Sequence, residues 1–277
     1  MNTSLKTEQR RFRPRIEDAD PFPDSQRVVY ARNPLELVIC QFRFPPILKI
    51  SSEPPAIFQD QLRREYPLYR AIPAITLPGG LPAEVSNLVE GMISFPGAKA
   101  HEFSSADGAW AVTVIQESLA LTCKNYTRWE HFKEHLRLPL ELLIRLYEPS
   151  FLTRIGLRYR DVIDRSVLGL TDVPWGNLLS KDLAGAFHSA IAPFIEGLTH
   201  QVVVKLQNGL ARVTIQHGLA QKGEQVCYII DSDFSVTERT EHQDAMGILD
   251  YFNRQSGRLF RWLIADRLHN AMDPRPV

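Results

Sequence analysis

The stretch PLELVICQFRFPPILKISSEPPAIFQDQLRREYPLY, residues 34–69, predicts a strand, a turn and a helix in direct succession. Leu35 to Phe44 alternates and is rich in Val, Ile and Phe, as a buried strand is. Pro45-Pro46 ends that strand. A helix is expected from Ser52–Pro55 onward, because proline costs little in a first helical turn. The stretch contains no glycine, no cysteine pair and no acid pair, so it indicates architecture and not chemistry.

Outward from this stretch, the pattern predicts an α+β fold. In the middle of the chain, strands are expected over 93–103 and 110–123, around a turn at Asp107-Gly108, followed by a helix over 128–147 and a strand over 153–163. Pro139 predicts a kink in that helix, or two pieces. The last third predicts strands over 201–207, 210–217 and 225–234, then one long helix over 243–272, in which Gly257 allows a close approach to another element or marks a bend.

This pattern predicts that the chain is divided into three segments. Residues 1–33 form an extended or disordered basic arm, 34–165 a first α+β unit, and 166–277 a second unit of three strands and a long helix. The strands are antiparallel and helices pack on one face, in two sheets or in one continuous sheet. The Pro- and Gly-rich residues 71–90 predict a loop that contacts a partner.

Composition places the chain among ordinary globular proteins. It has 277 residues, 44% of them hydrophobic, and 32 basic residues balance 32 acidic ones, so nucleic-acid binding would need a local basic patch. Cys40, Cys123 and Cys227 lie in separate apolar runs, which is typical of buried thiols in a reducing compartment. With no signal-like start and no run long enough to span a bilayer, the sequence predicts a cytoplasmic protein without a membrane role.

Three segments carry a resemblance to a known family. They are the string Pro-Leu-x-x-Val-x-Cys-Gln-x-Arg-Phe-Pro-Pro from residue 34, the segment 110–126, and the strand Arg-Ile-Gly-Leu-Arg-Tyr over 154–159. In these the chain resembles a sporadically distributed family of uncharacterised bacterial and archaeal proteins of similar length. The resemblance spans residues 33–273 and implies no activity or catalytic residue. Its patchy distribution suggests carriage on mobile or defence-related loci.

One candidate metal site is the motif H-x-x-E-H formed by His131, Glu134 and His135. Histidines four residues apart on a helix project together and can hold Zn²⁺, with the glutamate as the base for its water. A third ligand, Glu148 or Glu196, is needed. The alternative is a pair of histidines that point to solvent, because the core stripe runs across the same helix.

A second candidate is Asp231-Ser232-Asp233, expected at the end of the strand 226–230. Two acids one residue apart at a strand end can share a divalent metal. The alternative is that they end the strand and begin a turn.

A third candidate is the row Arg154, Arg158 and Arg160, which alternation places on one face of a strand. Such a row can receive phosphate or carboxylate groups, and the alternative is salt bridges to Asp161, Asp164 and neighbouring strands. Arg11 and Arg13 of the N-terminal arm add a second basic segment. Together they are the binding residues that the sequence proposes.

The sequence favours a non-catalytic binding module without a cofactor, because it has no phosphate-binding loop, dinucleotide fingerprint or nucleophile elbow. A protein partner is the expected ligand, in a bacterial defence or toxin–antitoxin type of locus. One alternative is a metal-dependent hydrolase or nuclease that uses a divalent metal. A second is a nucleic-acid-binding protein that uses the basic strand. A homo-oligomer is compatible with all three.

Overall fold

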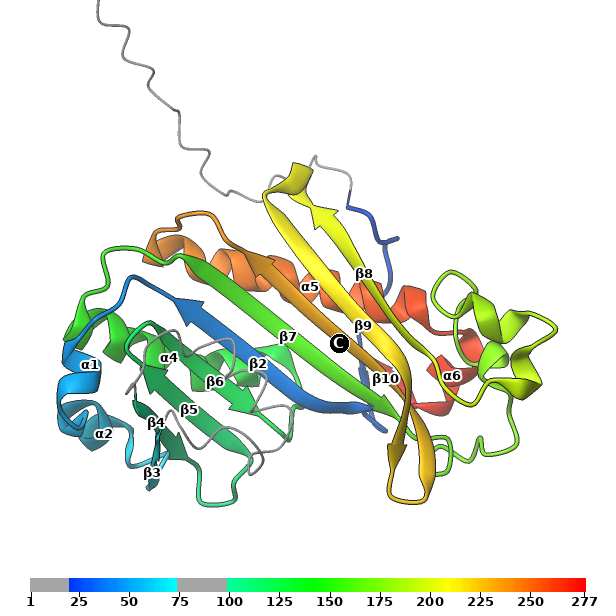
Figure 1. Cartoon of the computed structure of the whole chain (residues 1–277), viewed down its shortest axis with the longest axis horizontal. Coiled ribbons are helices and arrows are strands. Elements are labelled where there is room, and N and C mark those ends of the chain that lie inside the picture. Colours follow the sequence, from blue (N-terminus) through cyan, green and yellow to red (C-terminus); the bar gives the residue numbers. More distant parts are fainter. Residues whose placement is uncertain (1–19, 74–98) are drawn as a thin grey trace, which may run out of the picture.

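A nine-stranded antiparallel sheet organises the protein (Figure 1). The computed structural model describes residues 20–73 and 99–277. In spatial order the strands are β3 (Leu68–Pro73), β4 (Lys99–Ser104), β5 (Trp110–Ile115), β6 (Ser118–Cys123), β2 (Leu35–Arg43), β7 (Arg154–Ile163), β10 (Gln225–Val236), β9 (Ala211–Lys222) and β8 (Thr199–Leu206). The α+β prediction is confirmed, and of the two arrangements left open the structure has the continuous sheet.

The sheet is continuous because two central strands, β2 and β7, pair with each other. Val38 lies opposite Tyr159, Cys40 opposite Leu157 and Phe42 opposite Ile155. On either side of this seam the chain follows the same order: a central strand, an excursion, antiparallel strands that return to the centre, and a long helix. β7 opens the second of these halves, although the sequence placed it in the first unit. The two α+β halves therefore share one sheet.

Two long helices, α4 (Trp129–Tyr147) and α5 (Ala245–Leu263), cover one face of the sheet (Figure 1). The shorter helices are α1 (Lys49–Ser52), α2 (Ala56–Leu62) and α6 (Asp266–Ala271). Single 3₁₀ turns are η1 (Trp175–Asn177), η2 (Gly185–His188), η3 (Ala192–Phe194), η4 (Gln207–Gly209) and η5 (His242–Asp244).

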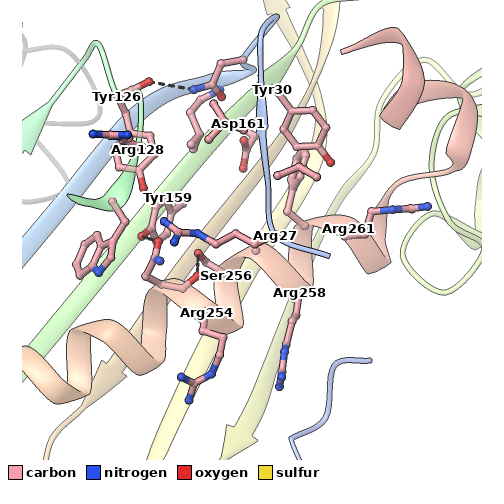
Figure 2. A pocket seen from close by; sticks show the side chains of 18 of the residues that line it. Arg27, Tyr30, Tyr126, Arg128, Tyr159, Asp161, Arg254, Ser256, Arg258 and Arg261 are labelled. Atoms are coloured by element: carbon pink, nitrogen blue, oxygen red, sulfur yellow. Dashed lines mark hydrogen bonds between the residues drawn. The ribbon is translucent and has the colours of Figure 1, made fainter. Parts of the chain in front are cut away.

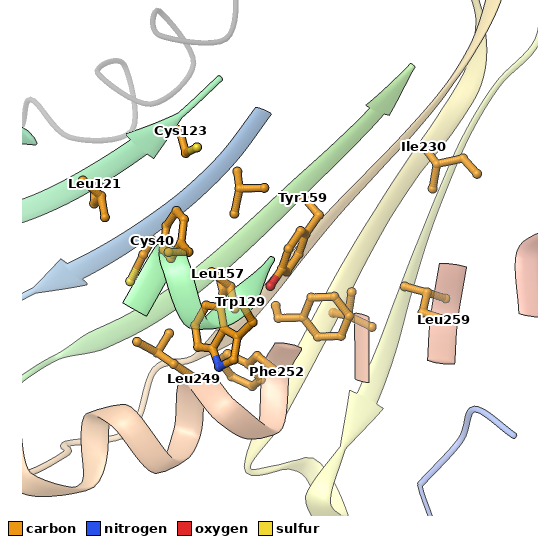
Figure 3. Packing of buried hydrophobic residues seen from close by; sticks show 14 of the residues in the cluster. Cys40, Leu121, Cys123, Trp129, Leu157, Tyr159, Ile230, Leu249, Phe252 and Leu259 are labelled. Atoms are coloured by element: carbon orange, nitrogen blue, oxygen red, sulfur yellow. The ribbon is translucent and has the colours of Figure 1, made fainter. Parts of the chain in front are cut away.

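The main core fills the space between the sheet and these two helices (Figure 3). Inward-facing side chains of the central strands, such as Cys40 and Leu157, are fully buried, as is Phe252 of α5. Cys123 and Cys227 are buried and free as well, so the prediction of buried thiols is confirmed. Burying apolar surface in this layer supplies most of the stability of the fold.

Two predicted elements are wrong in detail. The expected strand 110–123 is a hairpin of β5 and β6, because the polar pair Gln116-Glu117 turns the chain. The expected helix 243–272 is two helices, since Ile264 is extended and forms a bridge with Leu179. Of the two alternatives predicted at Pro139, two helical pieces are wrong, because α4 runs unbroken through this proline, whose ring is buried against the core.

The described part of the predicted extended or disordered arm, residues 20–33, is packed against the fold. Phe22 is buried, with its ring 5.9 Å from that of Trp262. β1 (Val28–Tyr30) pairs with β11 (Pro274–Pro276) in a small second sheet. A single aromatic anchor between prolines gives no periodic pattern, so the sequence hides it. Arg11 and Arg13, and residues 74–90 of the proposed partner loop, lie outside the described residues.

Candidate ligand-binding cavity

The two faces of β7 carry different chemistry because successive side chains alternate across a strand. Arg154, Arg158 and Arg160 point to the face opposite α4 and α5, which we call the open face. Tyr159 and Asp161 point to the face that the helices cover, which we call the helix face. The proposed phosphate receptor and the cavity described below therefore lie on opposite sides of one strand.

On the open face, the proposed arginine row and the proposed metal-binding acids bind each other. Arg158 donates from Nε and Nη2 to the two carboxylate oxygens of Asp231 at 2.7 and 2.6 Å. Arg154 donates to Asp233 at 2.8 and 2.9 Å and to Gln41 at 2.9 Å. Arg154 and Arg158 therefore form salt bridges to a neighbouring strand, which is the alternative that the sequence left open. Bidentate pairs between arginine and a carboxylate are among the stronger hydrogen-bonded ion pairs.

The acids of this network lie inside a strand and do not end it. β10 continues to Val236, and Asp231 and Asp233 stand opposite Arg160 and Arg158 in the register with β7. The predicted strand end is wrong because the apolar run stops at Ile230 while the backbone pairing continues. Arg160 also lies near an acid, with its Nε 3.8 Å from the carboxylate of Glu36.

The H-x-x-E-H motif lies at the other end of the fold, on α4 above the first hairpin. The His131 and His135 Nε2 atoms are 3.3 Å apart, and the ring of His135 stacks on Trp110 with centroids 3.9 Å apart. Both histidines are half-buried and not directed to solvent as expected, while Glu134 is exposed. The Tyr66 hydroxyl lies 3.1 Å from His135 Nδ1. These contacts give the pair a packing role.

Within residues 20–73 and 99–277, no group of three or more His, Cys, Asp or Glu side chains is arranged to hold a metal ion. Glu148 and Glu196, the proposed third ligands, do not join the histidines. Burial and the neighbouring His131 lower the pKa of His135, so its ring is predominantly neutral at neutral pH.

On the helix face, a cavity of about 590 Å³ lies between the N-terminal segment, the start of α4, α5 and the sheet (Figure 2). Its floor is formed by β7 and β10, through Tyr159, Asp161, Ile230 and Ser232. Its walls are the segment 25–35, the segment 126–133 and one flank of α5. A volume of this size is typical of sites for small organic molecules.

The carboxyl of Asp161 lies at the floor of this cavity. The residue is 5% exposed, and no hydrogen bond or ion pair joins its carboxyl to another described residue. Burial, and then the charge of Asp231 across the sheet, raise the pKa of Asp161 well above its ordinary value. Buried acids are normally paired, so a buried acid without a partner at a cavity wall marks a candidate functional group.

Next to Asp161 stands a cluster of buried tyrosines. The Tyr159 hydroxyl donates to Asn253 Oδ1 at 3.1 Å, and burial raises its pKa well above the ordinary value, so the proton stays on the oxygen. The ring of Tyr126 meets that of Tyr159 edge to face, with centroids 6.0 Å apart. Tyr30 approaches from the N-terminal segment. These groups give the cavity an aromatic wall with hydroxyl groups at its edges.

The two acids at the mouth of the cavity are paired with cations, while Arg128 and Arg254, which also line it, are exposed and have no acid within ion-pair distance among the described residues. Arg27 donates to Glu130 at 2.7 Å, which ties the N-terminal segment to α4. Asp250 accepts from Lys133 at 2.9 Å and from the Trp129 indole at 2.6 Å. Each of these carboxylates has a donor within hydrogen-bond distance, in contrast to Asp161.

Gly257 lines the cavity from the middle of α5. No described atom outside its own turn lies within 4 Å of the position that a Cβ would take there, so the expected close approach to another element is absent. Alanine is intrinsically more stable than glycine in a helix interior. The missing side chain enlarges the cavity instead.

Sequence reasoning weighed Asp161 solely as a salt-bridge partner of the arginine row. A signal was present, because Ile155, Leu157, Tyr159, Asp161 and Ile163 share the buried phase of the strand. An acid in that phase is expected to be buried. The other lining residues come from three distant segments and carry no local motif.

No family model matches the chain, and no curated protein matches it. Among the described residues, no helix has the length and hydropathy needed to cross a bilayer.

Proposed function

We propose that the protein is a non-catalytic binding module whose ligand is a small organic molecule held in the cavity on the helix face. The observation that carries this proposal is the Asp161 carboxyl, which is buried at the cavity floor without an ion-pair or hydrogen-bond partner among the described residues. An ionisable group of this kind costs stability unless a ligand satisfies it.

The geometry of the cavity supports the same proposal. Its lining combines the aromatic side chains Tyr30, Tyr126, Trp129, Tyr159 and Phe260 with a larger number of polar and charged groups, and small-molecule sites use such polar groups to fix the orientation of a ligand. The open space at Gly257 enlarges the site where a longer side chain would fill it. The acids of the alternative hydrolase are engaged by Arg154 and Arg158, so that alternative and the nucleic-acid alternative have less support.

The test is retention of small molecules from an extract of the native host, measured by mass spectrometry after the protein is separated from unbound compounds. Gly257→Trp fills the cavity, and Gly247→Trp is the matched control. Gly247 lies on the same helix, also has open space at its Cβ position, and does not line the cavity. We expect compounds retained by the wild type and Gly247→Trp to be lost from Gly257→Trp. Equal retention by both variants would contradict the proposal.

Recognition of a protein partner is a second candidate, favoured by the edge strand β8. β8 pairs with β9 alone, and Val202 and Val203 on it are 47% and 54% exposed. An exposed apolar edge can accept an extended strand from another chain. A partner captured by the wild-type protein and lost from Val203→Lys would support this candidate, and equal capture by both would count against it.

A further inference from the structure

The charges around the cavity indicate which class of molecule it receives, an inference that rests on the proposed small-molecule function. The lining acids Glu130 and Asp250 are neutralised by Arg27 and Lys133. On the far flank of α5, Arg258 pairs with Asp20 at 2.9 Å and Arg261 pairs with Asp266. Asp161 is left as the lining carboxyl without a cation among the described residues.

The basic groups do not make the interior a site for anions. Figure 2 shows Arg254 and Arg258 projecting from α5 away from Asp161, while Arg27 reaches across the mouth. An anion on the floor would meet the Asp161 carboxyl either as a neutral acid or as a like charge, and would gain no counter-charge from it in either state. A cation in the same place would be attracted.

Aromatic rings surround the remaining space. Tyr30 and Phe260 meet edge to face with centroids 5.8 Å apart on one side, and Tyr126 and Tyr159 do so on the other. The faces of such rings attract cations, and a carboxylate among them adds a counter-charge. An acid within an aromatic enclosure is the arrangement that recognises organic ammonium or guanidinium groups.

We propose that the cavity binds an organic cation, a primary amine or a guanidinium carried on an apolar or aromatic body. The charged nitrogen donates to the Asp161 carboxylate, and the body lies among the rings of Tyr30, Tyr126 and Phe260. The hydroxyl groups of Ser232 and Tyr159, also on the floor, are available to a second polar group of the ligand.

Binding of a cation is coupled to the proton on Asp161. In the empty protein, burial favours the protonated carboxyl. A bound ammonium group favours the ionised carboxylate, so binding displaces the proton into solvent. The charged and titratable groups that surround Asp161 are Arg27 and Tyr30 on the N-terminal segment, Tyr126, Arg128, Glu130 and Lys133 near the start of α4, Tyr159 on β7, Asp250, Arg254, Arg258 and Arg261 on α5, and Asp231 across the sheet.

The test uses isothermal titration calorimetry with small probes matched in shape. Tyramine and agmatine are the cationic probes, 4-ethylphenol is the neutral match of tyramine, and 3-(4-hydroxyphenyl)propionate is the anionic match. We expect a cationic probe to bind, with the release of about one proton when buffers of different ionisation enthalpy are compared. Asp161→Asn should weaken that binding about tenfold or more and abolish the proton release. Asp164→Asn, which changes a half-buried acid outside the cavity, should leave both unchanged.

The probes separate failure of this inference from failure of the proposed function. If the neutral or anionic probe binds, the cationic probes do not, and Gly257→Trp abolishes the binding, the cavity is a ligand site and the cation inference is overturned. If Gly257→Trp abolishes the binding of none of the probes, the cation inference is overturned. The proposed function then depends on the extract experiment, in which compounds retained by the wild type must be lost from Gly257→Trp. Proton release is measured on the wild-type protein, so the test does not depend on how a variant folds.

Discussion

The two faces of the central sheet keep their ionisable groups in different states. On the open face, Arg158 and Asp231 are both charged and neutralise each other at hydrogen-bond distance. On the helix face, three positions further along β7, Asp161 has no cationic partner among the described residues, and burial raises its pKa and favours the neutral form. This difference indicates where a ligand can bind. The charged groups of the open face find their partners within the chain, whereas the Asp161 carboxyl on the helix face has no such partner among the described residues.

The largest expected effect is the loss of one member of the open-face network. Arg158→Ala leaves the Asp231 carboxylate, whose side chain is 12% exposed, without its guanidinium partner. We expect the free energy of unfolding to fall by about 3–5 kcal/mol, as for other buried pairs from which one partner is removed. Urea denaturation at neutral pH measures it.

A matched control for Arg158→Ala is Arg63→Ala, which removes an exposed i,i+3 pair with Asp60. That change should alter stability by less than about 1 kcal/mol. Similar small effects for both variants would show that the open-face pairs contribute no more than ordinary surface pairs do.

On the helix face, a buried histidine predicts sensitivity to acid. His217 lies 2.7 Å from the Tyr228 hydroxyl, and burial lowers its pKa from 6.5 to about 4. The unfolded chain binds a proton in that window and the folded protein does not. The free energy of unfolding should therefore fall by roughly 2–3 kcal/mol as the pH drops from 6.5 to 4. NMR titration of the ring gives the pKa directly, and His217→Gln should flatten this part of the stability profile.

Asp161 predicts the opposite slope with pH. Its pKa is raised in the folded protein, so the folded protein keeps a proton that the unfolded chain releases above its ordinary pKa. The free energy of unfolding of the wild type should decline as pH rises through that window. Asp161→Asn removes the decline and should add about 1–3 kcal/mol at neutral pH, because it replaces an unpaired acid with a neutral side chain of similar shape. Denaturant unfolding from acid to neutral pH is the measurement.

The smallest expected effect concerns Gly257. Alanine there has open space and a better helix propensity, so Gly257→Ala should raise the free energy of unfolding by about 0.5–1 kcal/mol. A marked loss of stability would mean that the space beside α5 is not open. The larger Gly257→Trp is the change expected to block the ligand.

The sequence predicted the architecture better than the site. Some elements can be predicted from the local pattern of apolar residues, because their side chains pack into one shared core. They are the strands Leu35–Arg43 and Arg154–Ile163 and the helix Trp129–Tyr147. The hairpin at Gln116-Glu117 and the helix end at Ile264 depend on contacts with distant segments, and the local pattern does not contain them.

The site was missed for a related reason. The sequence analysis gave weight to visible motifs, and the structure uses Arg154, Arg158, Asp231 and Asp233 to satisfy one another. What marks Asp161 is the lack of a partner among the described residues, which becomes visible when the neighbours of β7 are known. Residues of the segment 25–33, which belongs to the predicted extended or disordered arm, form one wall of the cavity.

The most direct test compares one chemical change on the two faces, Asp161→Asn and Asp231→Asn, by urea denaturation at about pH 7.5, where ordinary carboxyl groups are ionised. These acids lie on neighbouring strands, one directed to the helices and one to the arginines. We predict opposite signs: Asp161→Asn raises the free energy of unfolding, and Asp231→Asn lowers it by removing the carboxylate that accepts two hydrogen bonds from Arg158. If both changes destabilise the protein, Asp161 has a stabilising partner within the chain. That result would contradict the proposal that the cavity is a ligand site.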